Sequence, residues 1–230
     1  MKNILLKRTS PWVSSFRKLA LTVWDKPKDP TTYGKVELEI SELTSYLIEK
    51  NKITATSISI NHAIGKIMGL VFEKYPDINI TLIRNKPKHR KKINIFFHTH
   101  IQTKKGYDLL GITVEDINKK SLEDIAEEVN NKTNALKANK TKHMENSKRI
   151  LTSLPLIIIK PLVKCLDSIM YSLNLNLKWM GLPQDPYGSL GITSIAALGM
   201  EEAYVPLFPF SRLGMILAIG KKQKKPVVIN

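Results

Sequence analysis

The side chains best suited to acid–base chemistry or metal binding are five histidines, which are scattered along the chain. Only His98 and His100 have the spacing of a ligand pair, because residues two apart on a strand point to the same face. Zinc requires a third and usually a fourth ligand, and no cysteine or carboxylate lies close to this pair in the sequence. We therefore expect no metal, and we interpret the pair as part of a substrate-channel wall or as an exposed strand end.

The other histidines are His62, His89 and His143. We predict that His62 lies at the surface or in an interface, because it falls off the apolar stripe of its predicted helix. A Ser-His-Asp hydrolase is not indicated, since the sequence has no Gly-x-Ser-x-Gly elbow. One small hydroxyl residue, Ser194, lies in a β-rich run, Tyr187–Met200. Taken by itself, this serine is interpreted as a small residue tolerated in a packed strand.

Helices and strands that would position these residues can be read from the hydrophobic pattern. Alternation over Lys35–Ile40 predicts a strand, and Ser41 is expected to cap the helix that follows. Apolar residues at helical spacing predict a long helix over Thr56–Tyr75 that ends before Pro76. Ser121 and Asp124 have the spacing of a capping box at the start of another helix.

Two further strands are predicted over Ile78–Ile83 and Ile93–His98, with a basic connection, Arg84–Lys92, between them. The β-rich run near residue 190 and a second run, Met215–Gly220, supply the closing strands. Helical and strand periods occur in one chain without an internal repeat or a shift in composition. The pattern therefore predicts a single α/β domain over residues 1–230.

Composition is ordinary for a globular protein, with 43% hydrophobic and 24% charged residues among 230. The single cysteine, Cys165, cannot form an internal disulfide, which is compatible with a reducing cytoplasm. The most apolar stretch, Ile150–Leu173, is interrupted by prolines and charges, so we interpret it as a buried or amphipathic helix. Because no signal peptide is visible either, we expect a cytoplasmic protein without a membrane span.

The net charge is +16, and the densest basic run is Arg84–Lys92. Proteins that bind nucleic acid combine such charge with a reading element or with stacking aromatic residues, and this run contains neither. We interpret the basic runs as solvated, lysine-rich loops and expect no nucleic-acid partner. A second interpretation is that a basic rim attracts an anionic cofactor.

Five stretches, in the correct order, resemble the catalytic domain of the dihydrolipoyl acyltransferases of 2-oxo-acid dehydrogenase complexes. They are Phe16–Ala20, Val36–Leu47, Thr54–Asn79, Lys119–Ala126, and Ile192–Met200 with the downstream Pro206. The resemblance implies the chloramphenicol-acetyltransferase-like fold. That fold is an α/β two-layer sandwich in which helices pack on one side of a largely antiparallel mixed sheet.

The resemblance also implies an enzyme that moves an acyl group between coenzyme A and a thiol or other acceptor, with acyl-CoA as a substrate. In this family a histidine acts as general base, and a serine or threonine hydroxyl donates to the oxyanion. That hydroxyl maps to Ser194, although a slip of one strand residue would exchange it with Thr193. Arg17 maps to the structural partner of the motif's aspartate. The expected assembly is a homotrimer or larger homo-oligomer with active sites between subunits.

The sequence departs from the family pattern at three points. It has no lipoyl domain, so no bound lipoyl group is expected, and residues 141–186 form an apolar, partly basic insertion. It also lacks the family's His-x-x-x-Asp-Gly motif. We therefore expect the C-terminal part of the domain to be missing and this chain by itself to be inactive. The alternatives are a catalytically inactive assembly or binding protein of the same fold and, less favoured, a basic protein associated with nucleic acid.

Overall fold

The structure is a computed structural model, and it describes residues 31–84, 86–103, 106–139, 161, 164–176, 184–208 and 211–226. For residues 100–103, 106–110 and 137–139 it describes the backbone. Arg17 and its predicted helix lie outside the described residues, as do His143, the side chain of His100 and much of the insertion at 141–186.

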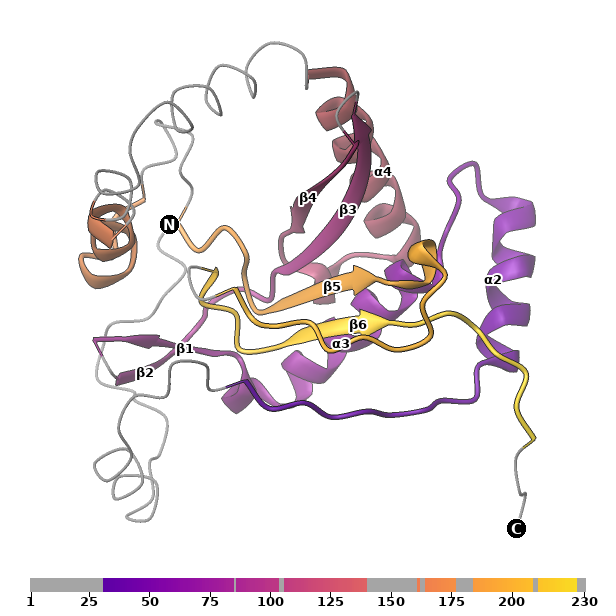
Figure 1. Cartoon of the computed structure of the whole chain (residues 1–230), viewed down its shortest axis with the longest axis horizontal. Helices are drawn as coiled ribbons and strands as arrows, with labels where there is room; N and C mark the ends of the chain where they lie inside the picture. The colour runs from indigo at the N-terminus through magenta and orange to yellow at the C-terminus, as the bar shows by residue number, and fades with distance from the viewer. Residues whose placement is uncertain are drawn as a thin grey trace.

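The described chain is built on a four-stranded sheet with strand order β4-β3-β5-β6. Strands β3 (Ile95–Thr103) and β4 (Gly106–Val114) form an antiparallel hairpin. Strands β5 (Leu190–Ser194) and β6 (Ile216–Ile219) then add in parallel on the other side of β3 (Figure 1). The expected mixed sheet is confirmed, although in this described sheet β3–β5 and β5–β6 are parallel and β3–β4 is antiparallel.

Two helices, α3 (Ile60–Lys74) and α4 (Leu122–Asn139), pack on the same face of this sheet (Figure 1). Their apolar stripes meet Ile95 and Phe97 of β3 and Ile192 of β5 in the largest core cluster. Burying one such side chain stabilises the fold by about 1.5–3 kcal/mol. The expectation that helices lie on one side of the sheet is confirmed.

Helix ends show which capping predictions hold. Ser121 and Asp124 form the predicted box, each backbone N–H donating to the other side chain at 3.1 Å. The helix at Ser41 begins differently from our prediction, because Ile40 occupies the N-cap of α2 (Ser41–Ile53) and makes no side-chain cap. The amide of Ser41 instead donates to Glu39 Oε1 at 2.7 Å, so the predicted Ser41 cap is wrong.

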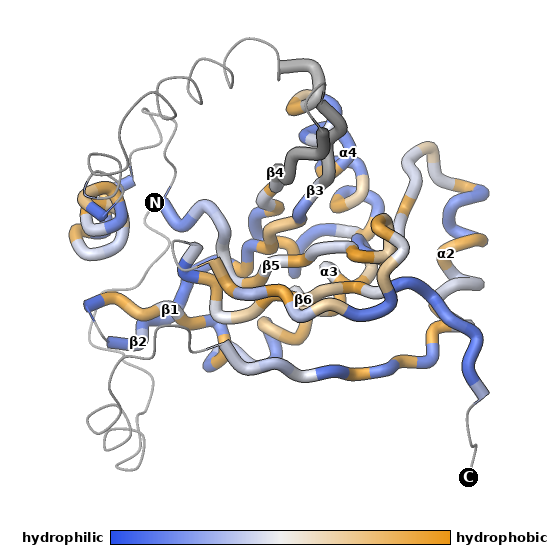
Figure 2. The backbone as a smooth tube through the Cα atoms, in the orientation of Figure 1, coloured by the Kyte–Doolittle hydropathy of each residue, from blue (hydrophilic) through white to orange (hydrophobic). Residues whose placement is uncertain are grey.

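The segment predicted as a strand over Lys35–Ile40 is extended, but it pairs with no other strand among the described residues. It runs beside the chain that leaves β5 and β6, where Lys35 Nζ lies 2.7 Å from Glu202 Oε2 and Lys225 Nζ lies 2.7 Å from Glu37 Oε1. Figure 2 shows the alternation of apolar and polar residues along it. Side-chain ion pairs hold this segment in place, and among the described residues its backbone joins no strand ladder.

The basic run is not the loop that we predicted. Strands β1 (Ile80–Ile83) and β2 (Lys86–His89) form an antiparallel hairpin that begins with a short 3₁₀ turn, η1 (Pro76–Ile78). Lys86 of β2 is exposed and Lys88 is half-buried, whereas Arg90, which follows the strand directly, is 5% exposed. No helix in the described part of the chain is long and apolar enough to cross a membrane.

Candidate functional site

Ser194 is the last residue of β5, immediately before the 3₁₀ turn η5 (Ala196–Leu198). Side chains alternate along a strand, so Ser194 shares the helix-covered face with the buried Ile192. Thr193 lies on the opposite face and is 7% exposed, whereas Ser194 is half-buried. The Ser194 hydroxyl makes no hydrogen bond to any described residue, so it remains available as a donor.

Beside Ser194 the parallel ladder between β3 and β5 comes to an end. Its last pair is Phe97 with Ile192, and beyond it Nδ1 of His98 lies 3.3 Å from the Ile192 carbonyl oxygen. On the other side, the ladder from β5 to β6 continues through Ser194, which pairs with Ile219. The strand end that carries the hydroxyl is therefore held firmly by β6 and freed from β3.

Our prediction that His62 lies at the surface or in an interface is wrong, because the residue is buried within the chain. Its side chain is 6% exposed, and its Nδ1 accepts a hydrogen bond from the Ser59 amide at 3.2 Å, closing a capping box at the start of α3. Burial lowers the pKa of His62 from 6.5 to about 4, so the ring is neutral near pH 7. Its ring meets Phe97 edge to face at a centroid distance of 6.2 Å.

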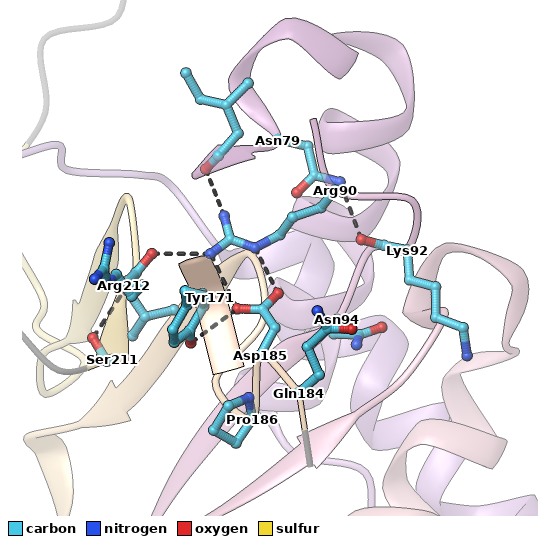
Figure 3. A network of polar contacts seen from close by, with 12 residues as sticks. Asn79, Arg90, Lys92, Asn94, Tyr171, Gln184, Asp185, Pro186, Ser211 and Arg212 are labelled. Atoms are coloured by element: carbon cyan, nitrogen blue, oxygen red, sulfur yellow. Dashed lines mark hydrogen bonds and ion pairs between the residues drawn. The ribbon is translucent and has the colours of Figure 1, made fainter. Parts of the chain in front are cut away.

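A buried ion pair fixes the chain just before β5. Arg90 Nε donates to Asp185 Oδ2 at 2.8 Å, and the two side chains are 1% and 0% exposed (Figure 3). The remaining guanidinium donors of Arg90 reach the carbonyl oxygens of Ile80 and Arg212 at 2.5 and 2.9 Å. Buried charges are tolerated only when they are paired and hydrogen-bonded in this way. One arginine thus joins the β1–β2 hairpin, the start of β5 and the loop before β6.

A second ion pair extends the same network. Arg212 pairs with Asp167, and its guanidinium lies 4.9 Å from the ring centroid of Tyr171. The Tyr171 hydroxyl lies 3.5 Å from Asp185 Oδ1, as Figure 3 shows. Burial, and then the negative charge of Asp185, raises the pKa of Tyr171 well above its ordinary range. Tyr171 belongs to a short π-helix, η3 (Ser168–Ser172), so the network also anchors the described end of the insertion.

Close backbone packing completes the approach to β5. Gly188 has φ +71°, and a Cβ there would lie 2.5 Å from the Asn94 carbonyl oxygen. That same oxygen accepts the Ser189 amide at 2.8 Å, and the Asn94 side chain accepts the Asp116 amide at 3.1 Å. Only glycine fits this left-handed, crowded position without strain.

Sequence reasoning missed Arg90 and Asp185. Arg90 stands between His89 and Lys91 in a basic run that we predicted to be solvated, and Asp185 lies near the end of the insertion predicted over residues 141–186. An arginine or aspartate is almost never fully buried unless it is paired, and the two are far apart in the sequence. No local signal in the sequence identifies such a pair.

Among the predicted site residues, the structure places Ser194 at a strand end and leaves Arg17 undescribed. His98 lies on β3 beside that end, although no metal site accompanies it. No group of three potential ligands from histidine, cysteine, aspartate or glutamate gathers among the described residues.

A mixed sheet with helices on one face and a hydroxyl at the end of an inner parallel strand makes this an α/β fold with a candidate donor at a strand end. Residues 18–154 match the family described as 2-oxoacid dehydrogenases acyltransferase (catalytic domain). The match covers more than half of the chain, and the chain belongs to this family.

Solved structures of that family share the fold. A probable dihydrolipoamide acetyltransferase from Listeria monocytogenes 4b F2365 aligns with a TM-score of 0.62 and 16% identity, covering 98% of this chain and 80% of that one. The cubic core of a pyruvate dehydrogenase multienzyme complex aligns with a TM-score of 0.54 and 17% identity, covering 82% of this chain and 61% of that one.

A third similar structure is the dihydrolipoamide acetyltransferase of Azotobacter vinelandii, in which the catalytic roles of a serine, a histidine and an asparagine were investigated. It has a TM-score of 0.50 and 16% identity, and the alignment covers 82% of this chain and 61% of that one. A comparison with curated protein sequences found no match.

Proposed function

We propose that this chain supplies the oxyanion-stabilising half of a coenzyme-A-dependent acyltransferase site, with Ser194 as the donor. The observation that carries the proposal is the position of this hydroxyl. It is half-buried, makes no hydrogen bond to any described residue, and lies where β5 has parted from β3. Membership of the family and the serine studied in the Azotobacter enzyme support the same role.

In the proposed reaction the acceptor attacks the carbonyl of an acyl-CoA, and the tetrahedral intermediate carries a negative oxygen. The Ser194 O–H donates to that oxygen, which stabilises charge that appears only as the transition state is approached. A histidine of a His-x-x-x-Asp-Gly motif removes the acceptor proton, and Arg17 pairs with the aspartate of that motif. When the intermediate collapses, its bond to sulfur breaks and the departing CoA thiolate takes the proton back from the histidine. The 230 residues do not contain this motif, so we expect the chain by itself to be inactive.

The proposal includes a homotrimer or larger homo-oligomer in which one subunit contributes Ser194 and its neighbour the histidine. The relative solved as a cubic core supports an oligomeric state. A reducing, cytoplasmic location also belongs to the proposal, since the sequence has a single cysteine.

The first test is to read the gene past codon 230. An in-frame His-x-x-x-Asp-Gly motif supports the enzyme, and a stop codon rules out catalysis by this chain. A stop codon at that place would favour the alternative, a non-catalytic assembly or binding protein of the same fold.

The second test compares Ser194→Ala with Thr193→Ala in the protein that carries the histidine motif. Loss of one oxyanion donor lowers kcat by about 10²–10³. We expect that loss for Ser194→Ala, measured as CoA released from acetyl-CoA, and a much smaller change for Thr193→Ala. The reverse order would assign the donor to Thr193.

A further inference from the structure

A hollow of about 250 Å³ lies beside the first turn of α3, apart from the hydroxyl of Ser194. It is bounded by the start of that helix, by Phe97, His98 and Thr99 of β3, and by α4. The acyl transfer proposed above does not use it. Two polar side chains at the start of α3, Asn61 and His62, line it.

His62 brings a fixed hydrogen-bond donor to the hollow. Its Nδ1 accepts from the Ser59 amide, so the single proton of the neutral ring must be on Nε2. Burial lowers the pKa of His62 to about 4, which keeps the ring in this neutral form. The side chain is 6% exposed, and Nε2 donates to no described residue. Packing against Phe97 prevents the ring from turning away.

Asn61 brings an acceptor to the same hollow. Its Oδ1 is buried and has no hydrogen-bond partner among the described residues. Leaving such a group unsatisfied costs about 1–3 kcal/mol, so an unpaired buried oxygen requires an explanation. Because Oδ1 is closed to solvent, a ligand in the hollow recovers that cost only when the Asn61 side chain turns toward it.

The described lining of the hollow carries no lysine, arginine, aspartate or glutamate, although the chain has a net charge of +16. Its other polar groups are hydroxyls and an amide, such as Ser57, Thr133 and Asn130. The second titratable side chain is His98, whose Nδ1 lies beside the Ile192 carbonyl oxygen. A charged ligand group would lose its hydration here without meeting an opposite charge.

We propose that this hollow binds the uncharged amide group of a small molecule. The amide C=O accepts from His62 Nε2–H, and the amide N–H donates to Asn61 Oδ1 once the Asn61 side chain has turned toward the hollow. At about 250 Å³, the hollow is smaller than the 300–1,000 Å³ of common ligand pockets, so it holds one part of a larger ligand. The inference does not depend on acyl transfer.

The test uses three probes of one shape and different charge, namely acetamide, acetate and acetamidinium, added to the ¹⁵N-labelled full chain. Long-range ¹H–¹⁵N spectra report the ring nitrogens of each histidine. We expect acetamide to shift the His62 Nε2 signal with a Kd on the order of 10–100 mM, as suits four heavy atoms. Acetate and acetamidinium should bind at least tenfold more weakly. Equal binding of all three, or no saturable shift with acetamide, overturns the proposal.

Two variants locate the binding. Asn61→Ala removes the acceptor, and His62→Asn leaves a side-chain oxygen for the Ser59 amide on a side chain too short to present a donor where Nε2–H lies. Each should weaken acetamide binding at least fivefold. Asn118→Ala is the matched control, because Asn118 bonds to Glu73 outside the hollow, and it should bind acetamide like the parent. The ligand-free spectrum is a further readout, since a proton found on Nδ1 of His62 at pH 7 would overturn the assignment without any probe.

Discussion

His62 makes the stability of the fold depend on pH through one buried ring. In the unfolded chain this histidine takes up a proton near pH 6.5, whereas in the folded chain its pKa is lowered to about 4. Its contribution is therefore fully present above pH 6.5 and is lost as the pH falls toward 4. This difference between the two pKa values corresponds to about 3 kcal/mol in the free energy of unfolding.

We expect urea unfolding at pH 7 and pH 4.5 to show this loss in the parent and not in His62→Gln. The difference in unfolding free energy between the two proteins should change by about 2–3 kcal/mol over that interval. Carboxylates titrate in both proteins and cancel from the comparison. Parallel pH profiles would show that His62 is accessible to protons in the folded state.

Strand periodicity predicted the alternation of Thr193 and Ser194, because neighbouring strand residues must face opposite sides. The sequence could not show that His62 is buried. The spacing of apolar residues in α3 shows that His62 lies off the stripe. Its burial depends on β3 and α4, which lie beside the start of that helix. Helical spacing predicts which residues form the central apolar stripe. Whether a residue beside that stripe is also buried depends on tertiary packing.

Among the elements, the capped start of α4 offers a clean comparison with the uncapped start of α2. Replacing a serine N-cap by alanine typically costs about 1 kcal/mol. We expect Ser121→Ala to lower the unfolding free energy by about that amount in urea titrations, because the Asp124 amide loses its acceptor. Ser41→Ala should change it by less than about 0.5 kcal/mol, since Ser41 caps nothing. Equal losses in the two variants would contradict the cap assignment.

The network around Asp185 ties four elements together, so breaking it should cost far more than breaking a surface pair. Asp185→Asn leaves the guanidinium of Arg90 buried without a counter-charge, and we expect a loss of about 3–5 kcal/mol in urea unfolding. Glu115→Gln is the control, because its pair with Lys92 is solvent-exposed and contributes about 1 kcal/mol or less. A loss below 1 kcal/mol for Asp185→Asn would show that the pair does not anchor β5.

Predictions of helices and strands were right where short stretches of sequence carry the signal. They were wrong where the outcome depends on which strands pair with one another. The stripe of α3, Pro76 after it and the Ser121 box are all contained in short windows of sequence. The hairpin β1–β2 was read as strand and loop, because the lysines of β2 resemble a solvated run. The segment Lys35–Ile40 has the alternation and the extended backbone of a strand. Its own residues do not determine which strand, if any, it pairs with.

At the scale of the whole molecule, that segment presents an apolar surface. Val36 and Leu38 are 79% and 72% exposed, on an extended segment that joins no sheet in the described part of the chain. In the proposed homo-oligomer we expect a second copy to cover this surface, since exposed strand edges readily pair with another chain.

The double substitution Val36→Lys and Leu38→Lys should therefore shift the protein toward the monomer in sedimentation equilibrium. Ile53→Lys, at the end of α2 and 80% exposed, is the control and should leave the association unchanged. A double variant that associates like the parent would place the subunit contact elsewhere.

The parallel strand β5 also bears on how the chain reaches its fold. Helix α3, the β1–β2 hairpin, the β3–β4 hairpin and helix α4 follow one another along the chain, so they can assemble through nearby contacts. Strand β5 pairs with a strand made much earlier, as Leu190 opposite Ile95 illustrates, and such non-local pairing is slow. Until β5 arrives, one edge of β3 is open to other chains. A nascent or refolding molecule is thus most prone to aggregation before β5 has paired with β3. The Arg90–Asp185 ion pair, which fixes the chain just before β5, helps to end this period.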